Sequence, residues 1–162
     1  GDIPIYGTHR VIENLTYRFG YIFKSEKKYP GAPAVKVQII SKDNDFIISN
    51  KRFIPIEVMH NRLSIMGYRI GGFSYLTDVK YIEDDQLEKL RDSDVLVLNA
   101  LRVEPHPTHL NLEEALALVE KLKPKKAYFT HISHLLGFHD KVSKTLPKNV
   151  HLAYDNLQIN CS

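Results

Sequence analysis

Two histidines stand where a short apolar segment ends. Residues 127–130 read Ala-Tyr-Phe-Thr, which is typical of a buried strand, and His131 and His134 follow directly. In α/β proteins, binding and catalytic residues gather at strand ends and in the loops that follow them. Histidine is the commonest metal ligand and the usual acid or base near neutral pH. A site at His131 would need other side chains that converge on it from elsewhere in the chain.

Two further polar residues stand at the ends of apolar runs. His60 ends the run 53–59, and Asp78 follows Tyr-Leu-Thr at 75–77. A lone buried carboxylate is costly, so Asp78 needs a partner. Histidines and a carboxylate that converge from different strand ends are the ligand set of a zinc or manganese site. Taken singly, such an aspartate also fits a turn or a helix cap, and such a histidine fits a core or surface position. Only the joint placement of His60, Asp78 and His131 favours a metal site.

The segment 105–112, Pro-His-Pro-Thr-His-Leu-Asn-Leu, is a second cluster. Its two prolines restrict the backbone, so His106 or His109 could be held over the strand ends. A histidine there could act as a general acid or base, or bind an anionic group. The alternative is a proline-rich connector with surface histidines.

Two more residues could support such a site. His134 lies three residues beyond His131 and is either another ligand or a residue that orients one. Asp155 lies near the last predicted strands. It could orient a histidine, or its side chain could simply form an Asx turn.

Hydrophobic patterning predicts the elements that must position these residues. Alternation with a period of two, broken by turn residues, predicts a β-meander in the middle third of the chain. Strand–helix–strand units follow, and a capping box at Asn111 begins one helix. The sum is an α/β (α+β) sandwich rather than an all-parallel fold. The predicted segments are strands at 3–6, 35–39, 46–48, 53–60, 63–70, 73–78, 94–99, 126–130, 150–154 and 157–159, helices at 9–17, 84–91, 112–122 and 139–145, a segment at 19–23 that is extended or packed against the core, and a loop at 24–33.

The composition limits the class of protein. The 162 residues suit one domain, and the charge of +3 comes from 22 basic and 19 acidic residues that are well mixed. Even mixing argues against a dedicated nucleic-acid surface. The single cysteine, Cys161, excludes an internal disulfide and a cysteine-type zinc finger. No apolar run approaches the length of a membrane span and no signal-peptide pattern is present, so we expect a cytoplasmic protein without a membrane partner.

Four segments together resemble a known family. They read Tyr-Leu-Thr-Asp at 75–78, Pro-Thr-His at 107–109, Thr-His-Ile-Ser-His at 130–134 and Leu-Ala-Tyr-Asp at 152–155. In this order and spacing they resemble the C-terminal part of metallo-β-lactamase-fold hydrolases. The branch of phosphoribosyl 1,2-cyclic phosphate phosphodiesterases is the most similar, and the resemblance covers nearly the whole chain.

The resemblance implies an αββα sandwich with two divalent metal ions, zinc or manganese, between the sheets. It implies that Asp78 bridges the metals, that His60 and His131 complete one site each, and that His109 assists at the substrate phosphate. His134 and Asp155 would support the ligands, and His106 would contact the substrate. A metal-bound hydroxide would attack the phosphorus of a small phosphorylated substrate.

One family motif is absent. No His-x-His-x-Asp-His occurs here, so the chain would supply about half of the ligands. We expect residues 1–162 to be a single, truncated domain that is inactive alone, with partial metal occupancy or none, and that exposes core surface and so could form a homodimer. The alternative is a non-catalytic binding or interaction remnant of the same fold. The retention of His60, Asp78, His109, His131 and His134 favours the hydrolase.

Overall fold

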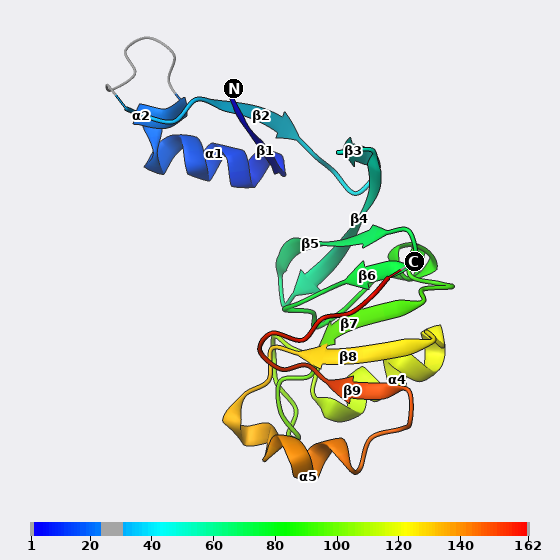
Figure 1. The fold of residues 1–162 in the computed structure, drawn as a ribbon. Coiled ribbons are helices and arrows are strands. Elements are labelled where there is room, and N and C mark those ends of the chain that lie inside the picture. Colours follow the sequence, from blue (N-terminus) through cyan, green and yellow to red (C-terminus); the bar gives the residue numbers. More distant parts are fainter. Residues whose placement is uncertain (1, 24–30, 162) are drawn as a thin grey trace. The chain divides into compact units, whose positions relative to one another are not determined.

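The computed structural model describes residues 2–23 and 31–161, whose elements are drawn in Figure 1. Contacts within the chain divide it into two compact units, residues 1–46 and 47–162. The expectation of a single domain over residues 1–162 stays a prediction. The loop predicted at 24–33 lies for the most part outside the described residues.

The smaller unit is a strand–helix–strand arrangement. Its elements are β1 (Ile3–Gly7), α1 (His9–Arg18), α2 (Gly20–Phe23) and β2 (Val35–Ile39). The two strands are parallel, with Ile3 beside Val35. These strands and the first helix were predicted, and Thr8 caps that helix by accepting a hydrogen bond from the Val11 N–H at 3.5 Å. The extended conformation predicted for 19–23 is wrong, because the Ile22 N–H bonds the Phe19 carbonyl at 2.8 Å in a helical turn.

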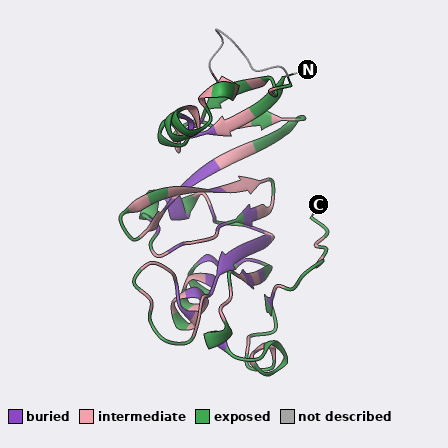
Figure 2. Cartoon of the chain, turned by 90° about the vertical axis from the view of Figure 1, so that its left-hand side faces the viewer, coloured by how far each residue is buried: buried purple, intermediate pink, exposed green. Residues whose placement is uncertain are grey.

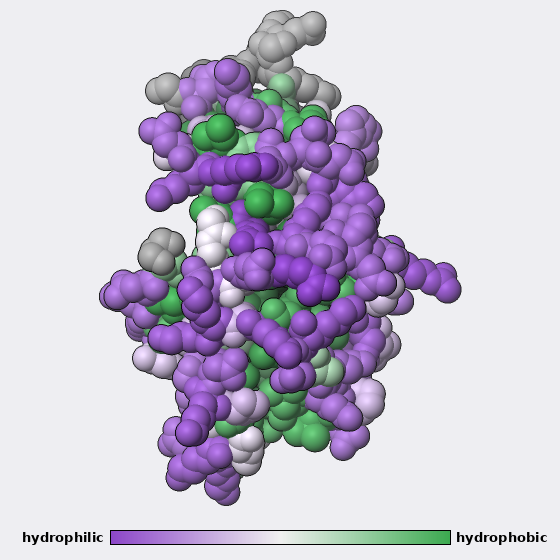
Figure 3. All heavy atoms as spheres, turned by 90° about the vertical axis from the view of Figure 1, so that its right-hand side faces the viewer, coloured by the Kyte–Doolittle hydropathy of each residue, from purple (hydrophilic) through white to green (hydrophobic). Residues whose placement is uncertain are grey.

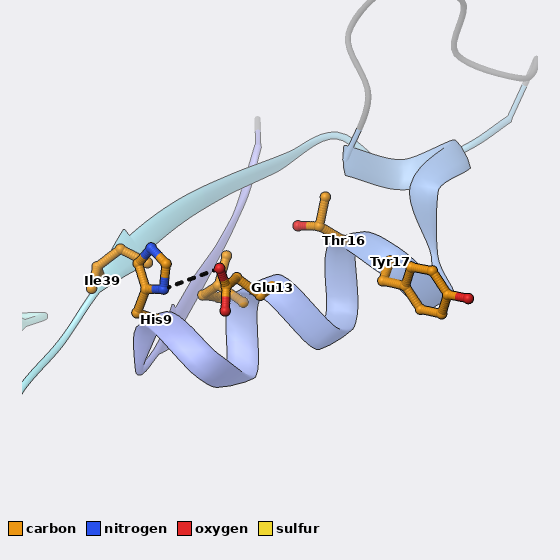
Figure 4. A pocket seen from close by; sticks show the side chains of 6 residues that line it. His9, Glu13, Thr16, Tyr17 and Ile39 are labelled. Carbon is orange, nitrogen blue, oxygen red and sulfur yellow. Dashed lines mark ion pairs between the residues drawn. The ribbon is translucent and has the colours of Figure 1, made fainter.

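A hollow of about 590 Å³ lies against α1 in this unit (Figure 4). His9 and Glu13 face each other across one helical turn, with 3.4 Å between Nδ1 and Oε1. Tyr17 and Ile39 also line the hollow. Both partners of the ion pair are well exposed, so the pair contributes little to stability.

The larger unit is built on a seven-stranded mixed sheet in sequential order, β3 to β9. The strands are β3 (Phe46–Ile48), β4 (Lys51–His60), β5 (Leu63–Ile70), β6 (Phe73–Tyr75), β7 (Val95–Asn99), β8 (Lys126–Thr130) and β9 (Val150–Leu152). Strands β4, β5 and β6 are antiparallel neighbours, as the predicted meander requires. Strands β6 to β9 are parallel. The mixed α/β fold expected from the sequence is confirmed.

The helices of the larger unit are α3 (Asp84–Glu88), α4 (Leu112–Leu122) and α5 (His139–Ser143), with a short 3₁₀ helix η1 (His134–Leu136). The first and last are shorter than predicted, because residues 89–91 and 144–145 form turns rather than regular helix. In the described parts of the chain, no helix is both long enough and apolar enough to cross a membrane.

The core lies between the sheet and α4. Every residue of β7 is buried, as expected for a strand covered on both faces. Helix α4 presents Ala115, Val119 and Leu122 to the core, and Phe129 of β8 is fully buried against it. Figure 2 shows buried residues concentrated in the strands and the facing side of the helix, with exposed residues in the connecting loops.

The strand predicted at 157–159 is wrong. Asn156 has a positive φ of 66°, which turns the chain away after β9. Leu157 and Ile159 instead line a hollow of about 690 Å³ with Ile70 and Phe73. Their alternating apolar side chains pack there without pairing to a strand. Figure 3 shows the face opposite the carboxyl ends of β7 to β9, where hydrophilic side chains surround a smaller apolar area.

The start of α4 is fixed by a polar network. Asn111 accepts a hydrogen bond from the Glu114 N–H, and Glu114 Oε2 accepts one from the Asn111 N–H, each at 2.9 Å. This is the predicted capping box. Glu114 Oε1 also accepts a hydrogen bond from Lys80 Nζ at 2.6 Å. Lys80 is two residues beyond Asp78, so the network ties the helix to the segment that carries this aspartate.

We expect this network to make stability depend on acid pH. Burial raises the pKa of Glu114, but the hydrogen bonds from Lys80 and from the Asn111 N–H outweigh it and lower that pKa below its ordinary value of 4.5. Because the pKa of Glu114 is lower in the folded state, its carboxylate stabilises the fold fully above about pH 4.5. This stabilisation is lost as the pH falls through the folded-state pKa. Glu114→Gln should therefore lower the free energy of unfolding at pH 7 by about 0.5–1 kcal/mol, a range that allows for solvent screening.

Urea denaturation of the wild type and the variant between pH 7 and pH 3 checks this expectation. The difference in the free energy of unfolding between the wild type and Glu114→Gln should shrink as the pH falls. Glu113→Gln is the matched control, because Glu113 lies in the same first turn of α4 and only Glu114 closes the capping box. A difference that stays constant with pH, or that Glu113→Gln reproduces, contradicts the account.

Candidate metal centre

Five strand ends of the larger unit lie along one edge of the sheet. Strand β4 runs antiparallel to β5 and β5 antiparallel to β6, so β4 points the same way as β6. Strands β7, β8 and β9 are parallel to β6. The carboxyl ends of β4, β6, β7, β8 and β9 therefore meet at the same edge, which faces the viewer in Figure 2. Ligand sites in α/β sheets form outside such carboxyl ends.

Three of the histidines converge on one carboxylate at this edge. His109 Nε2 lies 3.2 Å from Asp78 Oδ1, and His131 Nε2 lies 3.5 Å from the same oxygen. His60, Asp78 and His109 have ligand atoms that all lie within 4.8 Å of one another. The His109 ring lies beside both others, with centroid distances of 4.6 Å to His60 and 4.8 Å to His131. The structure thus brings together His60, Asp78, His109 and His131, which the sequence analysis had singled out.

A backbone carbonyl fixes the proton of His60. His60 Nδ1 lies 3.0 Å from the carbonyl oxygen of Asp78. A carbonyl oxygen only accepts hydrogen bonds, so Nδ1 carries the hydrogen and the neutral ring keeps its lone pair on Nε2. Metal-ligating histidines commonly donate their second N–H to a carbonyl or carboxylate in this way. His60 is therefore in the tautomer that leaves Nε2 free to bind a metal ion.

Asp78 is held in its charged form. Burial raises its pKa, but a hydrogen bond from His109, one from the Thr77 hydroxyl at 3.0 Å and the charge of His131 outweigh burial, and the pKa is lowered. An ionised carboxylate and imidazole nitrogens are donors that suit zinc and manganese. The donor set of His60, Asp78 and the neighbouring histidines thus fits a divalent metal ion.

His109 has polar partners on both sides of its ring. Its Nδ1 lies 2.8 Å from the Thr108 hydroxyl and 3.1 Å from His106 Nδ1, while its Nε2 faces Asp78. Burial lowers the pKa of His109, and the hydrogen bond to Asp78 opposes this effect. A neutral ring carries one proton, and here both nitrogens have an acceptor for it. This is the environment of a residue that can take up a proton on one side and give it up on the other.

The loop before α4 places His106 beside His109, with 5.0 Å between the ring centroids. His106 Nδ1 accepts a hydrogen bond from the Thr108 N–H at 3.4 Å. Burial lowers the pKa of His106, and the positive charges of Arg102 and Lys80 lower it further. Arg102 is held by the carbonyl oxygens of Glu104 and Pro105, at 3.2 and 2.7 Å. The surroundings of His106 are therefore electropositive.

Two residues of the cluster have unusual backbone conformations. Asp78 has a φ of 61° and His131 a φ of 53°. For residues other than glycine, this left-handed region costs about 1–2 kcal/mol. Such conformations persist where the surrounding structure enforces them, and they concentrate at functional sites.

A residue that we had not singled out from the sequence restrains Asp78. Asn99 ends β7 and is fully buried. Its Oδ1 accepts a hydrogen bond from the Val79 N–H at 2.7 Å, and its Nδ2 donates one to the Val79 carbonyl at 3.1 Å. Both polar groups of the residue after Asp78 are thus clamped by one side chain. The available signal was an asparagine at the end of an otherwise apolar, buried strand.

The two predicted supporting residues lie apart from these contacts. His134 and Asp155 are exposed, and neither has a hydrogen bond or ion pair to Asp78 in the described structure. His134 begins η1. The site assignment made from the sequence stays a prediction for all seven residues, which are His60, Asp78, His106, His109, His131, His134 and Asp155.

Comparison with known families decides where this fold belongs. A family model described as a Beta-lactamase superfamily domain matches residues 1–132. The chain belongs to the beta-lactamase superfamily. The resemblance seen in the sequence is confirmed, and the metallo-β-lactamase fold implies that divalent metals bind.

Two solved structures and one curated protein illustrate what this superfamily member is similar to. A crystal structure of a diphosphatase from the PhnP family is 36% identical, with a TM-score of 0.88, and the match covers 100% of this chain and 60% of that one. Zn²⁺-bound PqqB from Methylobacterium extorquens has the same fold, with 14% identity, a TM-score of 0.72 and coverage of 99% and 63%. An octanoyltransferase of Porphyromonas gingivalis is 30% identical over 158 residues, which are 97% of this chain and 32% of that protein. The chain thus spans a third to two thirds of the proteins it matches.

Proposed function

We propose that this superfamily member is part of a metal-dependent phosphodiesterase that acts on a small phosphorylated substrate. The observation that carries the proposal is the convergence of His60, His109 and His131 on the ionised Asp78. The 36% identity to a diphosphatase supports phosphate chemistry. The electropositive surroundings of His106 suit an anionic substrate.

We propose His60, Asp78 and His131 as metal ligands. When bound, divalent metals polarise a phosphoryl oxygen and lower the pKa of a coordinated water. His60 offers Nε2, because its Nδ1 donates to the Asp78 carbonyl. A dinuclear centre needs more donors than these three. The match covers 60% of the diphosphatase, and we propose that the remaining donors come from protein outside residues 1–162.

His109 is the proposed acid at the leaving group. It holds a proton at Nε2, beside Asp78 Oδ1, and can pass that proton to the oxygen that leaves the phosphorus. Thr108 and His106 contact Nδ1 and can stabilise the ring in either protonation state. His106 and Arg102 would attract the phosphate group to this position.

The test is hydrolysis of bis-p-nitrophenyl phosphate with added Zn²⁺ or Mn²⁺, by this chain and by the longer protein that contains it. We expect metal-dependent turnover in the protein that carries the full ligand set, and we expect His109→Ala to lower kcat by about 10²–10⁴-fold with unchanged metal content. His9→Ala in the smaller unit is the control.

An octanoyl thioester serves as the comparison substrate, because one relative is named an octanoyltransferase. Hydrolysis of the thioester without hydrolysis of any phosphodiester would overturn the proposal. So would full activity of His109→Ala.

A further inference from the structure

We propose that Val103, Leu135, Phe138 and Tyr154 form an apolar rim beside the candidate metal centre, and that this rim binds the aromatic base of a small nucleotide substrate. The inference rests on the proposed phosphodiesterase function and adds the class of substrate. These four residues are called the rim below.

Exposed apolar side chains are concentrated at one edge of the larger unit. Isolated exposed apolar residues are normal on a protein surface, whereas several in one place indicate binding. Seven large apolar side chains are exposed among the described residues of this unit, and the four rim residues follow the carboxyl ends of β7, β8 and β9. The seven are Ile47, Tyr75, Tyr81, Val103, Leu135, Phe138 and Tyr154.

Backbone pairing places Tyr154 near His131. Phe129 of β8 is paired with Leu152 of β9, and the Ala153 N–H continues the pairing with a hydrogen bond to the Phe129 carbonyl at 2.8 Å. Tyr154 is the next residue after this bond. Adjacent strands lie about 4.8 Å apart, so the chain at Tyr154 leaves the sheet beside the chain at His131.

A second backbone bond joins the other two loops of the rim. The Ser133 N–H donates to the Leu101 carbonyl at 2.9 Å. Val103 and Leu135 each lie two residues beyond this bond. The same two loops carry His109 and His131. Val103 and Leu135 of the rim therefore lie on the loops that hold two residues of the candidate metal centre.

The aromatic members of the rim are arranged for stacking. Phe138 is 76% exposed, and Lys141 Nζ lies 5.3 Å from its ring centroid. Tyr154 is 61% exposed, and the edge-to-face ring of His139 lies 6.2 Å away at 85°. Neighbours on one side thus orient both rings while most of each ring stays open to solvent. Nucleobases stack on exposed aromatic side chains of this kind.

The chemistry of the edge selects a small nucleotide. The metal centre and the electropositive loop suit a phosphate, and the rim suits a flat apolar group attached to it. A sugar phosphate without a base would leave the rim in water. A nucleic-acid polymer would need a basic surface along its path, whereas the charges of this chain are evenly mixed.

The test compares ligands with and without a base. Chemical-shift titrations of this chain with AMP and with ribose 5-phosphate, both in the presence of Zn²⁺, measure binding without turnover. We expect AMP to bind about 10-fold more tightly, as base–aromatic stacking allows. Phe138→Ala and Tyr154→Ala should each reduce the affinity for AMP towards that for ribose 5-phosphate and leave the latter unchanged. Tyr17→Ala, an exposed aromatic of the smaller unit, is the matched control.

The outcomes distinguish a failure of the base-binding proposal from a failure of the proposed phosphodiesterase function. If AMP and ribose 5-phosphate bind equally well, the rim does not bind the base and the proposal is wrong, even if the protein hydrolyses phosphodiesters. A base preference that Phe138→Ala and Tyr154→Ala abolish supports the rim, even if bis-p-nitrophenyl phosphate is not hydrolysed. Rim-dependent binding of octanoate in place of AMP would assign the rim to an acyl chain and overturn the proposal.

Discussion

Asp78→Asn should abolish tight binding of a divalent metal while leaving the fold intact. Asparagine tolerates the left-handed conformation that Asp78 adopts at φ 61°, so the backbone has no new strain. The amide is nearly isosteric, but it replaces one carboxylate oxygen by an NH₂ group and removes the negative charge on which His109 and His131 converge. Even partners outside the ligand set commonly change metal affinity by about 10–100-fold, so loss of this carboxylate should exceed about 100-fold.

Zn²⁺ titration by calorimetry against a competing chelator measures the effect, with thermal unfolding of the metal-free forms as the test of folding. Asp140→Asn is the matched control, since its side chain is 96% exposed and its ion pair is with His139. If Asp78→Asn binds Zn²⁺ as the wild type does, the carboxylate is not a ligand. If Asp78→Asn does not fold, Asp78→Gly replaces it in the titration, because glycine accommodates the positive φ and also lacks the carboxylate.

Asn99→Ala should be strongly destabilising although it touches no proposed ligand. The variant leaves the Val79 N–H without the acceptor that Asn99 supplies at 2.7 Å. The Val79 carbonyl loses the Asn99 donor at 3.1 Å but keeps the hydrogen bond from the Leu110 N–H at 2.7 Å. The unsatisfied N–H costs about 1–3 kcal/mol and the lost hydrogen bond to the carbonyl about 0.5–1.5 kcal/mol, so the free energy of unfolding should fall by roughly 2–4 kcal/mol. Because Val79 follows Asp78 directly, the loss should also weaken Zn²⁺ binding.

Urea denaturation of the metal-free proteins measures the stability change of the Asn99 variants. Asn99→Asp keeps an acceptor for the Val79 N–H but places a buried carboxylate oxygen against the Val79 carbonyl, so we expect it to be destabilising as well. Asn160→Ala, at an exposed position, is the control. A loss below about 1 kcal/mol for Asn99→Ala would mean that other groups or water replace the clamp.

The edge of the sheet was predictable because local patterns mark it. Apolar runs that end in His60 and His131 indicated strand ends. The strand predicted over 73–78 ends earlier, at Tyr75, and Asp78 lies three residues beyond it. The order of strands brings these ends together. The capping box at Asn111 fixed the start of α4 in the same way. Each of these signals lies within a few residues of the feature it predicts.

Features that depend on distant contacts were not predictable. Asn99 clamps Val79, 20 residues away, and its role depends on how the segment after β6 crosses the end of β7. The segment 157–159 alternates like a strand, but Asn156 turns the chain and its apolar residues pack into a hollow. The proximity of His109 to Asp78 depends on the path of the loop 100–111, which two prolines restrict but do not determine.

The most direct test of the metal centre is a crystal of this chain grown with Zn²⁺ and measured at the zinc absorption edge. The account predicts an anomalous peak about 2.0–2.2 Å from His60 Nε2 and from an Asp78 carboxylate oxygen, with an imidazole nitrogen of His131 in the same shell. Zinc bound elsewhere, or a His60 that binds through Nδ1, would contradict it.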